Sequence, residues 1–163
     1  METIVLKPMA EQDCAAVARI LKNDTIKRTY MVPDLTDPDA RKLASRMVAL
    51  SHDPARYVRG IYMDRELIGF LNDTELHGRS IELGWVIDPA HHNRGYATAA
   101  VRAAIGELFA AGFGQIVAGA FENNTASIRV MQKAGMTLTD RTEQIEYREE
   151  IHRCVYYTAT PDG

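Results

Sequence analysis

The sequence lacks the strong basic charge and the long apolar runs that mark several classes of protein. Its 163 residues include 19 basic and 22 acidic side chains, which gives a net charge of −3. Non-specific nucleic-acid binding relies on a basic field, so this balance favours no nucleic-acid partner. No apolar run approaches the roughly 18 residues of a membrane-spanning helix, and the first residues have no signal-peptide pattern. We therefore expect a cytoplasmic protein with no membrane partner.

Cysteine is scarce, and no residues are spaced for a metal. Cys14 and Cys154 lie near opposite ends of the chain, and neither belongs to a CxxC or Cys/His pattern. We expect two reduced, unrelated thiols and no metal cofactor. His91 and His92 are adjacent but lack partners at metal-site spacing, which favours a solvated turn.

No repeat, low-complexity tract or linker rich in proline, glycine or serine divides the chain. Apolar residues make up 46% and charged residues 25% of the sequence, as in an ordinary soluble globular protein. A chain of this length can bury a core without disulfides or metals. We therefore predict one domain over residues 1–163.

Hydrophobic periodicity predicts alternating strands and helices. The predicted strands cover residues 3–9, 56–63, 66–72, 80–88 and 115–121, with one or two more over roughly 137–144 and 153–159. The predicted helices cover residues 11–21, 37–51, 95–111 and 125–133, and residues 23–38 are expected to be irregular. This order predicts an α/β (α+β) fold, in which a mixed, mostly antiparallel central sheet is flanked by helices and contains one parallel crossover.

The sequence predicts two local features of the sheet, a hairpin turn and a strand irregularity. Asp64-Arg65 stands between two strands and predicts a tight hairpin. Gly84 inside a strand suggests a bulge or a close approach of another backbone. The two N-terminal helices carry little chemistry, and a lid that grips the substrate is one option for them.

The clearest candidate for chemistry is the turn over residues 92–98, where a strand becomes a helix. Gly95 and Ala97 are small, so the backbone there can approach a ligand closely. The first amides of a helix have no intrahelical partner and carry the positive end of its dipole, which suits a phosphate. The sequence after Gly95 fits neither a nucleotide P-loop nor a dinucleotide-binding loop. Taken alone, the turn is equally compatible with a helix that merely begins at a glycine.

Several motifs in order resemble a known family. His92-x-x-Gly95-x-Ala97 resembles the Gln/Arg-x-x-Gly-x-Gly/Ala signature of the GNAT superfamily of N-acetyltransferases. The branch that includes the ribosomal-protein N-terminal acetyltransferases is similar in four places. These are Leu6-Lys7-Pro8, Glu82-Leu83-Gly84-Trp85-Val86-Ile87, Gly95-Tyr96-Ala97-Thr98-x-Ala100, and Asn124-x-x-Ser127 with its Lys133-x-Gly135-Met136 ending.

The resemblance implies a GNAT-like acyl-CoA-binding fold and an N-acetyltransferase. The enzyme would move the acetyl group of acetyl-CoA to a primary amine, either a small molecule or a protein N-terminus, by direct transfer in a ternary complex. The family needs no metal. A homodimer is one option because dimers are common among relatives.

The resemblance also implies which residues bind the cofactor. Val86 and Ile87 would offer backbone groups to the pantetheine arm. Asn124 would bond the pantetheine or the incoming amine, and Ser127 would lie beside the sulfur. The amides that would cradle the pyrophosphate are those of His92, Asn93, Arg94, Gly95, Tyr96, Ala97 and Thr98.

Three positions depart from the family pattern. His92 replaces glutamine or arginine. Met131 stands where many relatives have a tyrosine that protonates the leaving thiolate, and Gly119 stands where the ribosomal-alanine acetylators have a glutamate. The general acid and base must therefore lie elsewhere or be partly dispensable. One of the tail tyrosines could stand in, although strand packing is expected for each of Tyr147, Tyr156 and Tyr157.

Acetyl transfer requires a neutral amine, a stabilised carbonyl oxygen and a thiolate that can leave. An α-amine has a pKa of roughly 7.7–8.0 against about 10.4 for lysine, so a base matters less for an N-terminal acceptor. Glu82 is the candidate base, directly or through a water, although it could also be a carboxylate paired across the sheet. Ser127 is the candidate hydrogen-bond donor to the sulfur, although a serine in a first helical turn can bond locally. A backbone N–H near Val86 could stabilise the oxyanion.

Two other functions stay open at the level of the sequence. A non-catalytic acyl-CoA-binding or sensing module is favoured by the missing tyrosine. Another enzyme that uses a phosphate ligand, such as a nucleotide, is the third option. The choice of acceptor is expected to depend on residues 23–51 and on the tail hairpin, where the charged residues 146–150 are expected to be solvated.

Overall fold

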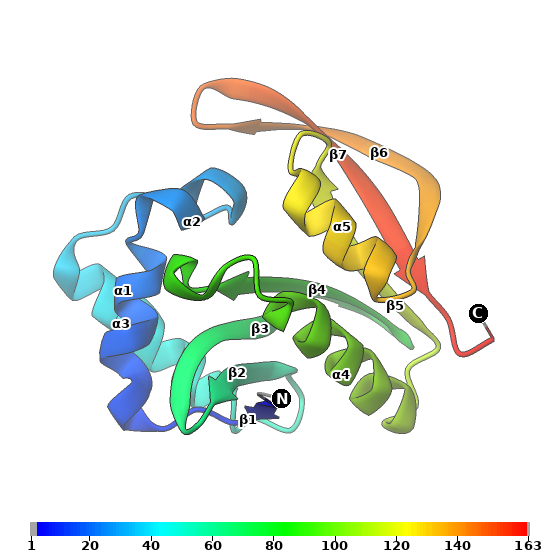
Figure 1. The fold of residues 1–163 in the computed structure, drawn as a ribbon. Helices are drawn as coiled ribbons and strands as arrows, with labels where there is room; N and C mark the ends of the chain where they lie inside the picture. The colour runs from blue at the N-terminus through cyan, green and yellow to red at the C-terminus, as the bar shows by residue number, and fades with distance from the viewer. Residues whose placement is uncertain (1–2, 163) are drawn as a thin grey trace. The chain divides into compact units, whose positions relative to one another are not determined.

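The computed structural model describes residues 3–162, which form a seven-stranded sheet with helices (Figure 1). The strands follow the order β1-β2-β3-β4-β5-β7-β6 across the sheet. Their bounds are β1 Ile4–Lys7, β2 Val58–Met63, β3 Glu66–His77, β4 Ser80–Ile87, β5 Gln115–Phe121, β6 Thr137–Tyr147 and β7 Glu150–Ala159. The pairs β1–β2, β2–β3, β5–β7 and β6–β7 are antiparallel, whereas β4 and β5 are parallel. The predicted mixed, mostly antiparallel sheet is confirmed, with its parallel crossover at β4–β5.

The helices are α1 Cys14–Leu21, α2 Asp24–Thr29, α3 Asp37–Leu50, α4 Tyr96–Ala110 and α5 Thr125–Lys133, with short 3-10 turns η1 Glu11–Asp13 and η2 Pro89–His91. The four predicted helices are confirmed within a few residues at their ends. Within the described part of the chain, none of these helices combines the length and the apolar character needed to cross a membrane.

Helix α2 shows that the prediction of an irregular segment over residues 23–38 was wrong in part. The Asn23 side chain accepts hydrogen bonds from the backbone amides of Thr25 (2.9 Å) and Ile26 (3.3 Å), which caps the helix. Ile26 is buried in the core. A helix of six residues is too short to display a period of 3.6, so the sequence pattern did not reveal it.

The predicted hairpin at Asp64-Arg65 is confirmed. Both residues have left-handed backbone, with φ of 48° and 71°, as a two-residue turn of type I′ requires. The turn between β6 and β7 uses the same conformation at Arg148 and Glu149, with φ of 51° and 67°. Neither turn contains a glycine, so each stores a small backbone strain that the paired strands offset.

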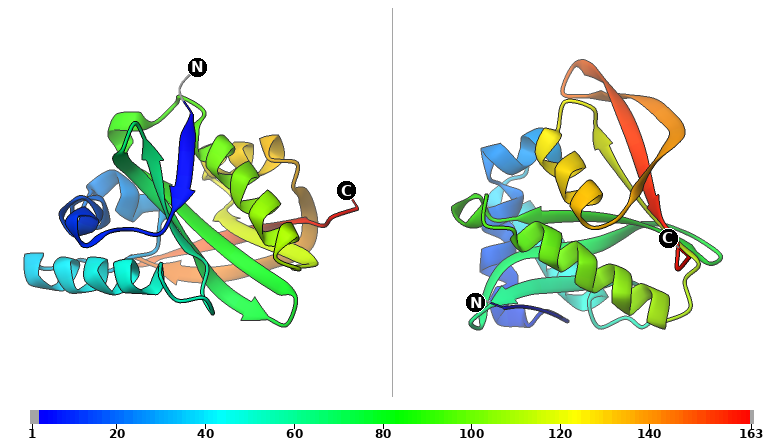
Figure 2. Two further views of the ribbon diagram at one scale, coloured as in Figure 1. Left: turned by 90° about the horizontal axis from the view of Figure 1, so that it is seen from below. Right: turned by 45° about the vertical axis from the view of Figure 1, so that its right-hand side comes forward.

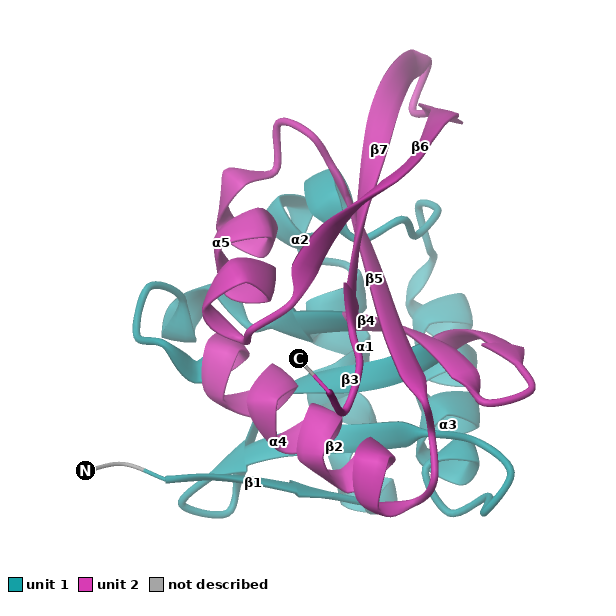
Figure 3. Ribbon diagram, turned by 90° about the vertical axis from the view of Figure 1, so that its right-hand side faces the viewer, with its two compact units in different colours: residues 1–73, 85–96 teal, residues 74–84, 97–163 magenta. Residues whose placement is uncertain are grey.

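The described residues fall into two compact units that alternate along the chain (Figure 3). Unit 1 comprises residues up to 73 and residues 85–96, and unit 2 comprises residues 74–84 and those from 97 onward. In unit 1, α1 packs against α3 (Figure 2). The apolar core of unit 1 includes Val17, Ile20, Ala44, Phe70 and Val86.

A buried ion pair reinforces unit 1 at the edge of that core. Asp73 is only 4% exposed and accepts hydrogen bonds from Arg56 Nε (2.9 Å) and Arg56 Nη2 (2.8 Å). The Tyr57 backbone amide donates to the same carboxylate at 3.1 Å. The carboxylate is thus fully bonded, as a buried charge must be to persist.

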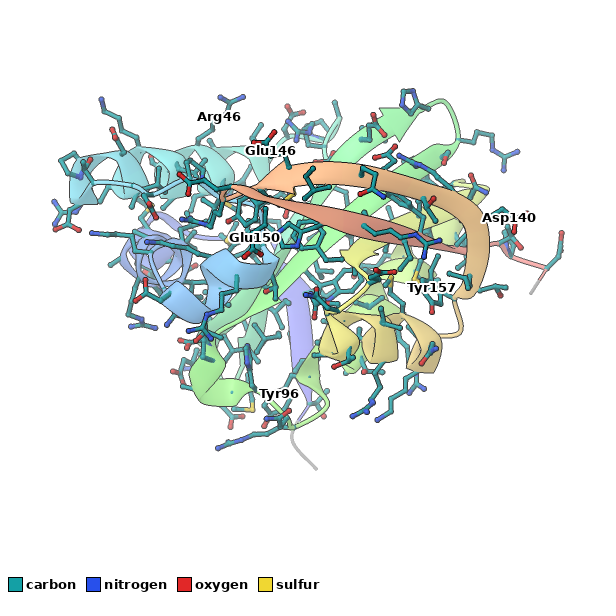
Figure 4. All side chains as sticks on the ribbon, turned by 90° about the horizontal axis from the view of Figure 1, so that it is seen from above. Arg46, Tyr96, Asp140, Glu146, Glu150 and Tyr157 are labelled. Atoms are coloured by element: carbon teal, nitrogen blue, oxygen red, sulfur yellow. The ribbon has the colours of Figure 1, made fainter. Side chains whose placement is uncertain are left out.

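Unit 2 contains α4, α5 and the long hairpin of β6 and β7. Figure 4 shows Glu146 and Glu150 at the closed end of this hairpin and Asp140 at its other, strongly curved end. The curve coincides with a register shift between Leu138 and Thr142. Glu146 and Glu150 are exposed, so the prediction of a solvated charge cluster is confirmed.

Candidate active site

The end of β4 leads into the predicted cofactor turn within unit 1. Val86 and Ile87 are buried, with 4% and 5% of their surfaces exposed. The Val86 carbonyl oxygen lies so near β3 that a Cβ at Gly69 would be 2.2 Å from it. Glycine at position 69 therefore allows the two strands to lie this close. Because the side chains of Val86 and Ile87 are buried, only their main-chain groups are suited to meeting a ligand.

Two anchors hold the turn that follows β4. Asp88 Oδ1 accepts a hydrogen bond from the Ala90 amide (3.1 Å), and Asp88 Oδ2 pairs with Arg19 Nη2 of α1 (3.1 Å). His92 Nε2 donates to the Ile87 carbonyl oxygen at 2.6 Å, an assignment that places the proton on Nε2. Where relatives carry glutamine or arginine, His92 thus braces the turn against the end of the strand.

His91 corrects the prediction of a solvated histidine pair. Its side chain is only 15% exposed, and its Nε2 lies 3.8 Å from Glu66 Oε1. Its ring is tilted against Tyr96, with 6.3 Å between the ring centroids. Its Nδ1 is buried and has no hydrogen-bond partner among residues 3–162. His91 is therefore a packed residue, whereas His92 is exposed.

The turn itself is exposed and opens helix α4. Asn93 and Gly95 have left-handed backbone, with φ of 62° and 81°, and residues 92–95 are all exposed. The space around the Cβ position at Gly95 is open to a distance of 4 Å. Tyr96, labelled in Figure 4, is buried at the first position of the helix, and Ala97 and Thr98 follow it, partly buried. An exposed helix N-terminus of this kind suits an anion.

Asn124 and Ser127 form a bonded pair at the start of α5 in unit 2. Asn124 Oδ1 accepts from the Ser127 amide (3.2 Å), and Asn124 Nδ2 donates to Ser127 Oγ (3.1 Å). The local bonding expected of a serine in a first helical turn is therefore present. Because Oγ accepts from Asn124, the hydroxyl proton of Ser127 is left to donate to another acceptor.

Glu82 lies on β4 within unit 2 and is held from two sides. Its Oε2 accepts from Thr74 Oγ1 at 2.8 Å, and its Oε1 lies 3.7 Å from Arg141 Nη1. Oε1 is buried and has no hydrogen-bond donor within the described residues. The carboxylate is thus paired across the sheet and still has one oxygen able to accept a proton.

Of the three positions that depart from the family pattern, Met131 and Gly119 are both enclosed by packing. Met131 is fully buried. A Cβ at Gly119 would lie 2.7 Å from Tyr156 Cε1 and 3.2 Å from Cys154 Sγ. The Tyr156 ring therefore occupies the space that a glutamate at position 119 would need.

The tail tyrosines pack in unit 2, as predicted. Tyr147 lies against Phe121, with 6.1 Å between the centroids, and Tyr157 accepts a hydrogen bond from Gln132 Nε2 at 3.4 Å. Tyr156 is 5% exposed and donates to Glu143 Oε2 at 2.8 Å. Burial raises the pKa of Tyr156 well above its ordinary value, with the Glu143 carboxylate adding to the effect.

Sequence reasoning missed Thr74, Arg141 and Glu143, which surround Glu82 and Tyr156. They belong to strands distant in the sequence, and no motif marks them. Only the period-2 alternation of β6, which places Arg141 and Glu143 on one face, was a usable signal.

The chain offers no obvious metal centre in the described part. No group of three or more histidine, cysteine, aspartate and glutamate side chains within residues 3–162 could hold a metal ion. Cys14 and Cys154 are both free thiols, as predicted.

Comparison with known proteins gives a consistent result. A family model described as an acetyltransferase (GNAT) domain matches residues 3–137. An uncharacterized N-acetyltransferase, YoaA of Bacillus subtilis strain 168, is 26% identical over 153 residues, which cover 90% of this chain and 86% of the relative.

Two solved structures illustrate the likeness of the fold. RimL, a ribosomal L7/L12 alpha-N-protein acetyltransferase in complex with coenzyme A, has a TM-score of 0.87 at 19% identity, covering 98% of this chain and 95% of that one. A spermidine N-acetyltransferase from Vibrio cholerae in complex with CoA and spermine has a TM-score of 0.83 at 16% identity, covering 98% and 96%.

Proposed function

The chain belongs to the GNAT acetyltransferase family, and from this premise we propose that it transfers the acetyl group of acetyl-CoA directly to a primary amine in a ternary complex. The acceptor is a small amine or a protein N-terminus. The observation that carries the proposal is the exposed turn over residues 92–95, which opens α4 with open space around Gly95. We also propose that the two units act as one domain, because the family match extends across residues of both.

The turn and the end of β4 bind the cofactor in this proposal. The amides of residues 92–98 surround the pyrophosphate, and Arg94, which is exposed, adds a positive charge at the rim. Each helix-dipole contact contributes only about 0.3–1 kcal/mol when exposed, so several amides must act together. The pantetheine arm bonds to the main chain of Val86 and Ile87.

The reaction uses residues of this chain for proton transfer. Glu82 takes a proton from the acceptor ammonium, directly or through a water, and the neutral nitrogen attacks the thioester carbon. A backbone amide near Val86 stabilises the oxyanion. The C–N bond forms, and the nitrogen gives its second proton to solvent. The C–S bond breaks, and the departing sulfur accepts a hydrogen bond from Ser127, with Asn124 orienting that hydroxyl. Solvent supplies the proton that converts the thiolate to free CoA.

A non-catalytic acyl-CoA-binding or sensing module is the second candidate function. It is favoured by the packing at positions 119 and 131, where relatives place proton-transfer groups and this chain has Gly119 and a buried Met131. Such a module would bind acetyl-CoA without turnover. A third function, a nucleotide-dependent enzyme, would be supported if the protein bound ATP more tightly than CoA.

Calorimetry and a thiol-release assay separate these functions. We expect saturable binding of acetyl-CoA and release of free CoA that depends on an amine, in a panel of peptides, polyamines and aminoglycosides. Glu82→Gln is expected to lower kcat about 100-fold, within the range for a lost general base. Ser127→Ala is expected to lower kcat without weakening binding of acetyl-CoA. Absence of binding at millimolar acetyl-CoA rejects the enzyme and the module alike, whereas binding without turnover supports the module.

A further inference from the structure

A layered group of side chains surrounds the proposed base within unit 2. The Tyr156 ring lies over Gly119, which has no side chain to displace it. The Arg141 guanidinium lies over the Tyr156 ring, 3.8 Å from its centroid. The same guanidinium reaches Glu82, with 3.7 Å between Nη1 and Oε1. Because Gly119 has no side chain, Tyr156 can lie over it, Arg141 over Tyr156, and the Arg141 guanidinium can then reach Glu82.

Arg141 is fixed by more than this stack. Its Nη2 bonds to Glu143 Oε1 at 2.9 Å, and Glu143 Oε2 accepts from the Tyr156 hydroxyl at 2.8 Å. Hydrogen bonds from Arg141 and Tyr156 lower the pKa of the Glu143 carboxyl. Arg141 therefore lies between the Glu82 and Glu143 carboxylates. The Tyr156 ring and the Glu143 carboxylate together orient its planar guanidinium, and the ammonium group of a lysine could not reproduce this arrangement.

Apart from Arg141 and Glu143, the side chains around Glu82 carry no charge near neutral pH. Thr74 of β3 donates a hydroxyl to Oε2. Burial raises the pKa of both the Cys154 thiol and the Tyr156 phenol of β7, so both stay protonated. Glu143 of β6 is an anion, because hydrogen bonds from Arg141 and Tyr156 lower its pKa, and Arg141 is the cation beside Glu82. Without Arg141, the Glu82 and Glu143 carboxylates would both lose the cation that lies beside them.

We infer that Arg141 is a positioning residue, which holds the Glu82 carboxylate in the orientation that takes the proton of the acceptor amine. The inference rests on the proposed function. Thr74 fixes one carboxylate oxygen, and the Arg141 charge restrains the other without donating a hydrogen bond to it, because 3.7 Å is too long for one. Oε1 is thus oriented and still able to accept a proton.

The test compares Arg141→Gln, Arg141→Lys and the control Arg59→Gln. Arg59 of β2 also lies over a tyrosine ring, 4.4 Å from the Tyr57 centroid, and it lies outside the proposed site, outside residues 23–51 and outside the tail hairpin. We measure kcat, KM for acetyl-CoA and the pH profile of kcat, together with the melting temperature. Arg141→Gln is expected to lower kcat about tenfold, because a misplaced catalytic group loses rate steeply, and to leave KM for acetyl-CoA unchanged.

The split between kcat and KM, and rescue by the conservative variant, distinguish positioning from a structural role. Arg141→Gln lowers kcat while KM for acetyl-CoA and the melting temperature keep their wild-type values. Arg141→Lys keeps a positive charge beside Oε1 and recovers part of the lost kcat. Arg59→Gln keeps the wild-type kcat, KM and pH profile.

Two kinds of result overturn the inference in distinguishable ways. If Glu82→Gln is inactive but Arg141→Gln has wild-type kcat and pH profile, the role of Arg141 is rejected and the proposed function stands. Equal losses in kcat and acetyl-CoA affinity with a lower melting temperature also reject it, because they indicate a structural role. If the wild type releases no CoA with any amine, the proposed function falls and takes the inference with it.

Discussion

Gly119 shows how a missing side chain can determine what surrounds it. An alanine there would place its Cβ 2.7 Å from a rigid, buried tyrosine ring, so the ring or the strand must move. We predict that Gly119→Ala lowers the free energy of unfolding by about 1–3 kcal/mol, the usual cost of overpacking, and lowers acetyl transfer by displacing Arg141. Chemical denaturation and the thiol assay measure both effects.

Gly106→Ala is the matched control. Gly106 is exposed within α4 and would contact nothing within 4 Å of the new Cβ. Alanine there is expected to raise the free energy of unfolding by about 0.5–1 kcal/mol, because glycine is the poorer helix former. Gly119→Ala with the same stability as Gly106→Ala would refute the packing argument.

Tyr30 gives the molecule a sensitivity to alkaline pH. Its hydroxyl donates to Asn72 Oδ1 at 3.0 Å, and burial raises the pKa of Tyr30 to about 12 from an ordinary 10.0. The folded state therefore keeps the phenol neutral where the unfolded state ionises it. This stabilisation is complete below pH 10 and is lost as the pH rises through about 12.

Tyr30→Phe removes that titration. We predict that its free energy of unfolding falls less steeply than that of the wild type between pH 10 and 12, by on the order of 2 kcal/mol over that interval. At neutral pH the lost hydrogen bond costs about 0.5–1.5 kcal/mol. Urea titrations at a series of pH values test this, and parallel curves for the two proteins would contradict it.

Single residues also show where sequence reasoning stops. Asn124 and Ser127 are three positions apart in one helical turn, so their spacing alone predicts that they meet. Glu82 could be proposed because its strand alternates. Arg141 and Thr74 could not be proposed. Their approach to Glu82 depends on strand register and on the Tyr156 ring packed over Gly119, and a sequence pattern reveals neither.

At the scale of elements, long periodic segments were predictable and short capped ones were not. Helix α4 and strand β5 follow from their apolar patterns. Helix α2 is stabilised by the Asn23 cap and by one buried side chain, Ile26. A single buried residue gives no hydrophobic periodicity, so the sequence pattern could not reveal this helix. The packed state of His91 depends likewise on its tertiary contact with Tyr96.

The junction of the turn with α4 gives an element-scale prediction. Gly95 has φ of 81°, where a residue with a Cβ is strained by about 1–2 kcal/mol. Because the surrounding space is open, Gly95→Ala acts through the backbone alone. We predict that the turn relaxes away from this conformation and that calorimetry gives a Kd for acetyl-CoA about 5–10-fold higher.

Gly78→Ala carries the same strain outside the proposed site. Gly78 has φ of 60° and equally open surroundings, but it lies in the turn between β3 and β4. It should lower stability by a similar amount and leave the Kd for acetyl-CoA unchanged. Equal affinities for the two variants would show that the conformation at Gly95 has no role in binding.

At the scale of the whole molecule, a cofactor that binds only the folded chain must stabilise it by mass action. With free acetyl-CoA at 100 times its Kd, the gain is about 2.7 kcal/mol. For a chain of 163 residues, about 2–4 °C accompanies each kcal/mol, so the melting temperature should rise by roughly 5–10 °C. Thermal scans over a concentration series measure this rise, which should grow with the logarithm of acetyl-CoA concentration once the sites are filled.

The identity of the stabilising ligand then decides what the turn recognises. ATP also carries a polyphosphate, but it lacks the pantetheine arm that the main chain of β4 is proposed to bond. ATP should therefore raise the melting temperature less than acetyl-CoA does at equal concentration. In the Gly95→Ala variant, the rise in melting temperature should begin at a higher acetyl-CoA concentration and then have the same slope against the logarithm of that concentration. An equal rise with ATP would mean that the helix N-terminus alone accounts for binding, and the assignment of Val86 and Ile87 to the pantetheine arm would fail.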